Sequence, residues 1–323
     1  MAQLLIIQTS SLGDVVHGLQ VASSLKEQRP DLAISWIGRE IFAPLVRGCA
    51  AIEQVYAFRR DGGLAGFFGL MREVRAREFD YVFDFQGLLR TGLMTFRTRA
   101  RRKVGRNDAR EGAGFFYDER VALPEGGRLS HPLDKLLQFA PVVGARAELR
   151  GALHFREAQG GLYSDHLLGR GGSRPIVMFP DSRRPDKRWN GFKQLTELIL
   201  REDRRRRVIW AGIHYLPDKD AFPAEQFLNL TGNTSVVSLP TLISRAAWVI
   251  SNESGPMHLA AALKVPVLGI FGATDPQLFG PYPPRGDQNH FIQAPVGDLR
   301  LLSAKEVHTR FRRVAGRTVE AGT

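Results

Sequence analysis

The sequence predicts an α/β fold made of two parallel-sheet halves in succession, and three observations carry this prediction. Apolar runs typical of buried strands alternate with amphipathic stretches typical of helices along the whole chain. The alternation restarts near the middle of the 323 residues, a length typical of two domains. Several strand ends run into turns rich in Gly, Ser, Asp and Pro, as at the ligand-binding edge of an open sheet. Helices are therefore expected to cover both faces of each sheet.

In the first half, four strands are expected, at 4–8, 33–37, 54–58 and 81–85. A helix over 15–28 follows the first strand and ends before Pro30. A second helix around 132–143 closes this half, and 144–158 is expected to connect it to the next.

In the second half, four strands are expected again, at 176–179, 208–211, 248–251 and 265–271. The expected helices are 192–201, 239–246, 256–263 and an amphipathic terminal helix over 303–314. Ligands of such sheets bind beyond the carboxyl ends of the strands, so a cleft between the two domains is the expected site.

Composition excludes several classes of protein. Apolar residues make up 43% of the chain, which is enough for real cores. Cys49 is the only cysteine, so an intrachain disulfide and a Cys-based metal site are both excluded, and a reducing, cytoplasmic compartment is expected. The apolar start of the chain is interpreted as a first strand rather than a signal peptide, and no run approaches the roughly 20 apolar residues of a membrane span.

The formal net charge of +12 favours an anionic partner, whether nucleic acid, a phosphorylated substrate or an acidic membrane surface, or else serves solubility alone. Cations gather at 97–106, just after a candidate site loop, and at 201–207, where a solvated helix end is expected to lead into a strand. A nucleic-acid binder is one alternative, but the aromatic residues fall mostly in apolar runs instead of alternating with the basic ones.

The turn at 252–255 is the most informative feature of the second half. It follows an apolar strand and precedes Pro256 and a helical stretch, so Ser254 or Gly255 can cap that helix. Free backbone N–H groups and the positive end of the helix dipole then point at one place, which suits a phosphate. Glu253 could bond sugar hydroxyls, and His258 in the first helical turn could reach a phosphate or pack internally.

A basic turn at 180–189 follows the first strand of the second half. Its four cations indicate an anion site, although the glycine spacing of a P-loop is absent and a solvated basic loop is the alternative. Lys187 suits neutralisation of a diphosphate by a point charge. No group of His, Asp and Glu has metal-ligand spacing.

The first half carries two candidate turns. In the turn at 9–14, Asp14 lies at a helix start, where it is either a helix cap or a general base facing the cleft. His17, one turn further on, is a helper or a buried helix residue. In the stretch 84–90, Gln86 and Arg90 could bind substrate hydroxyls or phosphates, and Asp84 is alternatively a structural hydrogen-bonding group.

These motifs together resemble glycosyltransferase family 9, the bacterial lipopolysaccharide heptosyltransferases. The stretch T-S-S-L-G-D-V-V-H at 9–17 is similar to the N-terminal signature of the heptosyltransferase I branch, and D-F-Q-G-L-L-R at 84–90 also matches. The basic turn at 180–189 resembles the family's phosphate-binding loop. N-L-T-G at 229–232, with 251–263 and 271–276, resembles its most specific C-terminal block.

The resemblance implies a GT-B fold, in which two Rossmann-like domains face each other across a cleft. Residues 1–155 would bind the acceptor, residues 156–300 would bind the nucleotide sugar, and 301–323 would pack back on the first domain. It also implies inverting, metal-independent transfer of a heptose from ADP-heptose, a substrate rather than a cofactor. The acceptor would be the lipid A–Kdo inner core, met by a peripheral protein at the cytosolic face of the inner membrane, with no role for nucleic acid.

Residue roles follow from the resemblance position by position. Asp14 would be the general base, and Lys187 would bind the donor diphosphate. The other implied donor-binding residues are Ser182, Arg183, Glu253, Ser254, Gly255 and His258. The implied acceptor-binding residues are Ser11, Gly13, Arg59, Arg60, Gln86, Arg90, His131 and Lys135.

The chain departs from the family pattern at three places. Glu253 stands where the family usually has Asp, and Asp181 stands where it usually has Gly. The stretch 212–220 lacks a clear match to the acidic residue that holds the donor ribose, for which Asp218 or Asp220 could substitute. These departures leave two alternatives open: a relative that uses another sugar nucleotide or another acceptor, such as a protein, and an inactive sugar-nucleotide-binding relative.

Overall fold

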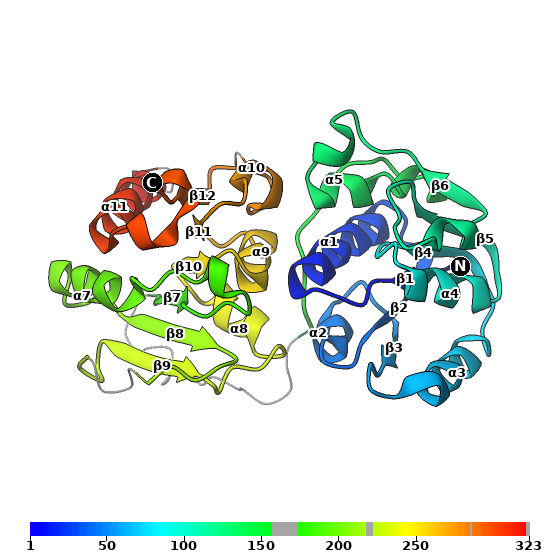
Figure 1. The fold of residues 1–323 in the computed structure, drawn as a ribbon, viewed down its shortest axis with the longest axis horizontal. Coiled ribbons are helices and arrows are strands. Elements are labelled where there is room, and N and C mark those ends of the chain that lie inside the picture. The colour runs from blue at the N-terminus through cyan, green and yellow to red at the C-terminus, as the bar shows by residue number, and fades with distance from the viewer. Residues whose placement is uncertain (157–173, 218–221, 285, 321–323) are drawn as a thin grey trace. The chain divides into compact units, whose positions relative to one another are not determined.

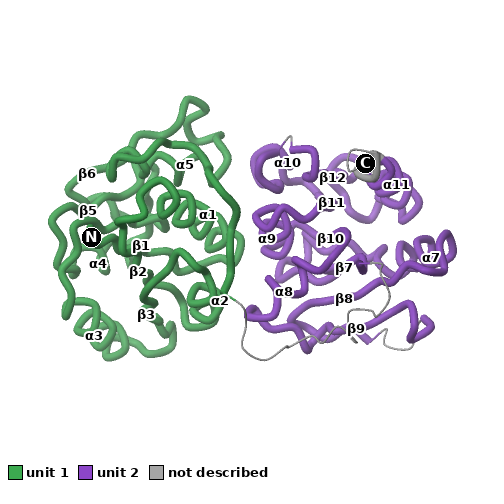
Figure 2. The backbone as a smooth tube through the Cα atoms, turned by 180° about the vertical axis from the view of Figure 1, so that it is seen from behind, with its two compact units in different colours: residues 1–157 green, residues 158–323 purple. Residues whose placement is uncertain are grey.

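The computed structural model describes residues 1–156, 174–217, 222–284 and 286–320. The chain divides into two compact units, Met1–Glu157 and Ala158–Thr323, which are coloured separately in Figure 2. Each unit holds one six-stranded sheet in which every neighbouring pair of strands is parallel, with helices packed along it (Figure 1). The expected α/β class is therefore confirmed.

The sheet of the first unit has the order β3-β2-β1-β4-β5-β6. Its strands are β1 Ala2–Ile7, β2 Leu32–Arg39, β3 Gln54–Phe58, β4 Phe79–Asp84, β5 Ala100–Arg106 and β6 Glu119–Val121. Its helices are α1 Leu12–Gln28, α2 Ala43–Gly48, α3 Gly63–Val74, α4 Leu89–Arg97 and α5 Pro132–Leu137, with short 3₁₀ turns η1 Ala113–Phe116, η2 Gly127–Leu129 and η3 Ala140–Val143.

The sheet of the second unit repeats this order as β12-β11-β10-β7-β8-β9. Its strands are β7 Ile176–Phe179, β8 Val208–Gly212, β9 Phe227–Thr231, β10 Trp248–Asn252, β11 Val267–Phe271 and β12 Asn289–Gln293. Its helices are α7 Phe192–Glu202, α8 Leu239–Ser244, α9 Gly255–Ala262, α10 Pro276–Phe279 and α11 Ala304–Glu320, with 3₁₀ turns η4 Pro185–Lys187, η5 Pro295–Gly297 and η6 Leu299–Leu301.

The central strands are apolar on both faces because helices cover both sides of a parallel sheet. Residues 4–7 of β1 are fully buried, and all five residues of β10 are buried. In α11, Val307, Phe311 and Val314 pack into the core of the second unit, where this helix lies against α7. That the terminal segment also packs back on the first domain stays a prediction.

Both sheets have the strand order of a Rossmann fold, in which the strand order reverses at one topological switch point between two central strands. That point lies between β1 and β4 in the first unit and between β7 and β10 in the second. Ile7 is in register with Asp84, and Phe179 is in register with Ser251, so the loops that follow each pair begin side by side. Ligands of this fold bind at this point.

Candidate active site

In the first unit, one side chain holds the two switch-point loops together. The amide oxygen Oε1 of Gln86, in the loop after β4, accepts hydrogen bonds from the backbone N–H groups of Thr9 and Ser10 at 3.0 and 2.9 Å. It also accepts the hydroxyl of Thr9 at 3.1 Å. Gln86 therefore fixes the loop between β1 and α1, whatever else it binds.

Asp14 is the third residue of α1, and its carboxylate caps that helix. Its Oδ2 accepts the backbone N–H of Ser11 at 2.7 Å and the Ser11 hydroxyl at 2.9 Å, which closes a capping box. The side chain remains partly exposed at the carboxyl end of β1. Gly13 lies beside it in the first turn of α1. The Asp14 carboxylate thus caps the helix and also remains partly accessible to solvent.

A buried carboxyl group supports the same end of the sheet. Asp84, the last residue of β4, is fully buried and accepts the N–H groups of Gln86 and Gly87, each at 3.0 Å. Its other oxygen accepts the hydroxyl of Tyr117 at 2.8 Å. Burial raises the pKa of Asp84, and its hydrogen bonds oppose that shift. The arrangement favours the structural interpretation of Asp84, and Tyr117 is a partner that local sequence patterns do not reveal.

His131 and Lys135, both predicted for the acceptor side, lie at α5. His131 caps this helix, since its Nδ1 accepts the N–H of Leu133 at 3.1 Å. Its ring lies edge-to-face against that of His17 in α1, with 5.1 Å between the ring centroids, and both residues are buried. Lys135 donates to the carbonyl of Arg128 at 2.8 Å and lies 3.6 Å from the Asp108 carboxylate. Lys135 is therefore largely enclosed.

The predicted acceptor-side arginines are exposed around the end of β3 and the start of α4. Arg59 pairs with Glu40 at 3.1 Å, and Arg60 follows it in the same loop. Arg90, in the first turn of α4, stacks its guanidinium carbon 5.4 Å from the centroid of the Phe58 ring.

In the second unit, an ion pair joins the two switch-point loops. Lys187 at the end of η4 pairs with Glu253, which follows β10, and the Thr274 hydroxyl donates to the other carboxylate oxygen of Glu253. The two charged side chains are 19% and 8% exposed. Both carboxylate oxygens of Glu253 thus have partners within the protein, while the Lys187 side chain remains partly accessible to solvent. Thr274 is a further partner that sequence reasoning did not find.

Asn252, the last residue of β10, is buried and links β10 to the basic loop by two hydrogen bonds. Its side-chain oxygen accepts the N–H of Trp189 at 3.1 Å, and its amide nitrogen donates to the carbonyl of Pro180 at 2.8 Å. Both ends of the basic loop 180–189 are therefore tied to β10. The sequence pattern predicted a polar turn at Asn252; the structure makes it the last residue of β10 instead.

The acidic residue that departs from the family pattern in this loop is neutralised. Asp181 accepts a hydrogen bond from Arg188 at 2.8 Å and contacts the ring nitrogen Nδ1 of His214 after β8. Ser182 is buried and Arg183 is exposed. The Asp181 carboxylate therefore does not stand as a lone negative charge beside the loop.

The helix that follows β10 begins at the same edge. Ser254 is the N-cap residue of α9 in extended conformation, and its hydroxyl lies 3.1 Å from that of Ser251. Gly255 opens the helix, and His258 lies half-buried in its first turn. The positive end of the α9 dipole at this helix start suits an anion next to Lys187. Asp218 and Asp220, the candidates for holding the ribose, lie outside the described residues.

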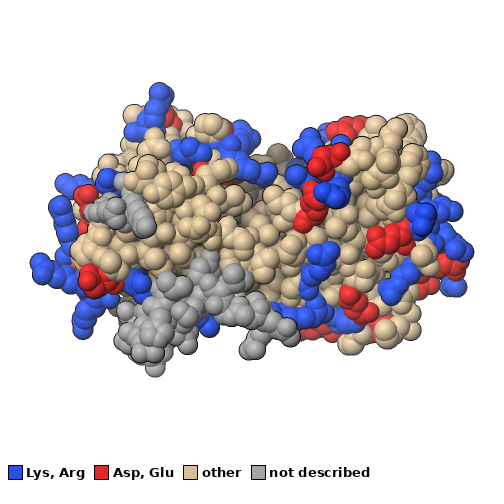
Figure 3. Space-filling view, turned by 90° about the horizontal axis from the view of Figure 1, so that it is seen from below, with Lys and Arg blue, Asp and Glu red and all other residues tan. Residues whose placement is uncertain are grey.

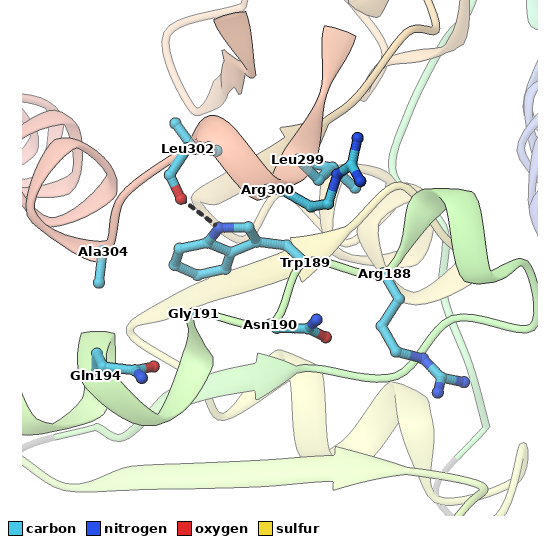
Figure 4. Close-up of a pocket in the computed structure, with 9 residues that line it drawn as sticks. All are labelled: Arg188, Trp189, Asn190, Gly191, Gln194, Leu299, Arg300, Leu302 and Ala304. Atoms are coloured by element: carbon cyan, nitrogen blue, oxygen red, sulfur yellow. Dashed lines mark hydrogen bonds between the residues drawn. The ribbon is translucent and has the colours of Figure 1, made fainter.

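Trp189, at the end of the basic loop, lines a pocket of about 460 Å³. Its indole N–H donates to the carbonyl of Leu302 at 2.8 Å, and Figure 4 shows the ring turned toward η6 while Arg188 extends the other way. The pocket is lined by Arg188, Trp189, Asn190, Gly191, Gln194, Leu299, Arg300, Leu302 and Ala304. The ring thus anchors the end of the basic loop.

Charge is distributed over each unit. On the face drawn in Figure 3, Lys and Arg side chains are interspersed with Asp and Glu. Of the basic cluster at 97–106, much lies in β5, where Arg102 pairs with Glu119 and Arg106 pairs with Asp108. Within the described ranges, no three His, Cys, Asp or Glu side chains gather as metal ligands would, and no helix has the length and apolarity to cross a membrane.

A model of glycosyltransferase family 9 (heptosyltransferase) matches residues 67–296, which is most of the chain. The chain belongs to this family. Lipopolysaccharide heptosyltransferase 1 of Escherichia coli O18:K1:H7 is 27% identical over 94% of this chain and 95% of its own length. The corresponding protein of Pseudomonas aeruginosa is 26% identical over 87% of this chain and 81% of its own.

Solved structures show the same fold. E. coli heptosyltransferase WaaC with ADP has a TM-score of 0.80 at 24% identity, covering 97% of this chain and 99% of that one. E. coli ADP-heptose lps heptosyltransferase II has a TM-score of 0.76 at 18% identity, covering 98% and 99%. The expected GT-B fold is therefore confirmed, and the protein is a heptosyltransferase enzyme.

Proposed function

We propose that this heptosyltransferase moves a heptose from ADP-heptose to the lipid A–Kdo inner core of lipopolysaccharide. The observation that carries the proposal is the group formed by Lys187, Glu253 and the N-terminus of α9 at the switch point of the second sheet. A cation beside the positive end of a helix dipole is suited to a diphosphate.

The donor is proposed from this chemistry and from the relatives. E. coli WaaC has been solved with ADP and with ADP-2-deoxy-2-fluoro heptose, and it shares this fold. In this chain Lys187 and the first turn of α9, from Ser254 and Gly255 to His258, would bind the diphosphate, and Ser182 and Arg183 of the basic loop would line the same side. Glu253 would orient Lys187 and meet the sugar.

The chemical step is a single displacement at the anomeric carbon. An acceptor hydroxyl oxygen forms a bond to that carbon as the bond to the diphosphate oxygen breaks, and the electron pair leaves with ADP. The hydroxyl proton passes to the carboxylate of Asp14, which is partly exposed at the carboxyl end of β1. Attack from the face opposite the leaving group inverts the configuration.

Stabilisation of the leaving diphosphate is assigned to Lys187 and the α9 N-terminus, with no metal ion. A fixed electrostatic donor of this kind contributes roughly 3–4 kcal/mol to the transition state. Addition of EDTA should leave the rate of transfer unchanged, whereas a strict requirement for Mg²⁺ would contradict this assignment.

The acceptor is assigned to the first unit. Arg59, Arg60 and Arg90 are exposed cations at the carboxyl edge of its sheet, and a phosphate- and carboxylate-rich lipid core carries the opposite charge. The remaining acceptor-side residues are Ser11, Gly13, Gln86, His131 and Lys135, which position the loops of that edge. We propose that the enzyme works as a peripheral protein at the cytosolic face of the inner membrane.

A donor screen tests the proposal. ADP-heptose and ADP should raise the melting temperature of the protein, because a ligand that binds the native state stabilises it. Release of ADP should then depend on a lipid A–Kdo acceptor. Stabilisation by UDP- or GDP-sugars in place of ADP-sugars would favour the alternative of another sugar nucleotide, which is motivated by Glu253 standing where the family usually has Asp. Donor binding without any transfer would favour an inactive relative.

A further inference from the structure

Helix α4 carries its apolar stripe on the outside. Leu89, Leu93 and Phe96 recur at the spacing of one helix face, and all three are exposed. The buried face holds Thr91, Gly92, Met94 and Thr95, and the two threonine hydroxyls donate to carbonyls one turn earlier at 2.9 Å. Three of the four large apolar side chains of α4 are therefore exposed, whereas an ordinary surface helix buries most of its apolar face.

Helix α3 repeats the feature. Leu64 and Phe68 lie one turn apart on the same face and are 77% and 48% exposed. Arg72 follows them on the next turn of that face. The core of the first unit takes only Leu70, Met71 and Val74 from this helix as fully buried side chains.

The two helices form one continuous face with η1. The guanidinium carbon of Arg97 on α4 lies 5.3 Å from the centroid of the Phe68 ring on α3. Phe96 contacts Phe116 of η1 at 5.8 Å between ring centroids, and the neighbouring Phe115 is 88% exposed. Figures 1 and 2, which view the molecule from opposite sides, both show α3 next to α4. We call this set the α3–α4 face: Leu64, Phe68, Leu89, Leu93, Phe96 and Phe115.

Cations border the α3–α4 face without carboxylate partners. Arg72, Arg90 and Arg97 make no ion pair with any described residue, and the ammonium group of Lys103 lies 5.5 Å from the centroid of the Phe96 ring. By contrast, Arg99 and Arg101 of the following segment pair with Glu78 and Asp80. The acidic residues near the face are Glu73 of α3 and Glu111, whose carboxylate accepts the backbone N–H of Leu89 at 3.2 Å. With Arg72, Arg90, Arg97 and Lys103, cations therefore outnumber carboxylates around an apolar centre.

We propose that the α3–α4 face docks on an anionic membrane surface. Exposed Phe and Leu side chains insert at the boundary between headgroups and acyl chains, while arginine stems extend so that the guanidinium groups meet acidic headgroups. This inference rests on the proposed function, because a lipid-anchored acceptor lies in such a surface. The face belongs to the unit that carries Asp14 and the acceptor-side arginines, so docking would bring that unit to its acceptor.

Vesicle binding of the full-length protein tests the proposal. The probe is a vesicle of phosphatidylethanolamine with phosphatidylglycerol, compared with one of phosphatidylcholine alone. Binding should require the anionic lipid and weaken with salt. The variant Leu64→Ser/Phe68→Ser/Leu93→Ser/Phe96→Ser should bind at least about tenfold more weakly, because it removes most of the insertable apolar area. The matched control is Leu129→Ser/Leu301→Ser, which removes two exposed leucines elsewhere and should bind as wild type.

A second measurement covers the case in which the fourfold variant fails to fold. In Phe68→Trp and Phe96→Trp, brominated lipids should quench the new tryptophan, whereas Leu129→Trp should escape quenching. The four native tryptophans are all buried, so they give a constant background. Equal quenching at all three positions would overturn the proposal. So would loss of self-association in the fourfold variant without any change in vesicle binding, which would assign the face to a second copy of this chain.

Transfer assays separate this inference from the proposed function. The fourfold variant should keep wild-type transfer to a deacylated, water-soluble acceptor and lose transfer to an acceptor embedded in vesicles. Wild-type protein that transfers heptose but binds no anionic vesicle would overturn the docking face alone. Wild-type protein that binds vesicles but transfers nothing would overturn the proposed function and leave the docking face standing.

Discussion

The carboxylate oxygen Oδ2 of Asp14 accepts a hydrogen bond from the backbone N–H of Ser11 at 2.7 Å. This bond gives the proposed general base a second task, since it closes the capping box of α1. The cap fixes the carboxylate at the carboxyl end of β1. Structural and chemical roles of this residue therefore need separate variants.

Replacement of Asp14 by Ala or Asn separates the two roles by stability. Asp14→Ala removes the acceptor of the Ser11 N–H and should lower the free energy of unfolding by about 1 kcal/mol. Asp14→Asn retains an amide oxygen and should lose much less. Urea denaturation of both variants measures the difference, and an equal loss in both would show that the cap does not depend on this oxygen.

Replacement of Lys187 by Met should weaken donor binding and slow transfer. The variant removes the proposed cation for the diphosphate and leaves Glu253 buried without its partner. We expect kcat/KM to fall by about 10²–10³-fold. Calorimetric titration with ADP and steady-state kinetics measure both effects. Lys305→Met, at an exposed site on α11, is the control; a similar fall there would point to a general effect of net charge.

Shortening Glu253 to aspartate tests the departure from the family pattern. The shorter side chain cannot reach both Lys187 and Thr274 as Glu253 does, because its carboxylate lies one methylene closer to the backbone. We expect a higher KM for the donor with a smaller change in kcat than in Lys187→Met. If Glu253→Asp instead transfers faster than wild type with ADP-heptose, the wild-type residue is adapted to another donor.

The Asp84–Tyr117 pair predicts a pH-dependent stability. Burial raises the folded-state pKa of Asp84 above its unfolded value. At a pH above the folded pKa, the ionised carboxylate therefore lowers the free energy of unfolding. This destabilisation disappears as the pH falls below the unfolded pKa. Tyr117→Phe removes a donor to that carboxylate and should raise its folded pKa further. The variant should therefore lose about 1–3 kcal/mol near neutral pH and less near pH ~4. Denaturation at the two values checks this, and a loss independent of pH would assign the cost to packing.

Most strands and the site loops could be predicted from local sequence, and four strands could not. The run Leu4–Ile7 is continuously apolar because both faces of β1 are covered, so its length and composition identify it. The missed strands are β5, β6, β9 and β12, which mix polar with apolar residues and lie toward or at the sheet edges, although the edge strand β3 was predicted. Helix ends shifted by a few residues: Pro141 divides the expected helix 132–143 into α5 and η3, and α11 continues to Glu320.

Contacts between distant parts of the chain were also beyond local patterns. The sequence around Asn252 predicts a turn residue. Its hydrogen bonds to Trp189 and Pro180 depend on the pairing of β7 with β10, which local patterns do not reveal. The neutralisation of Asp181 by Arg188 and His214 likewise depends on tertiary structure. The family itself was predicted from the motifs, and the family match confirms it.

The rate of heptose transfer by Asp14→Asn decides whether Asp14 is the general base. Formation of ADP from ADP-heptose is measured with a lipid A–Kdo acceptor, and ADP binding is measured on the same preparation. We expect wild-type ADP affinity with transfer reduced by about 10²–10⁴-fold, the contribution of a general base. Transfer at a near-normal rate in this variant, with the same donor and acceptor, would show that Asp14 is not the base.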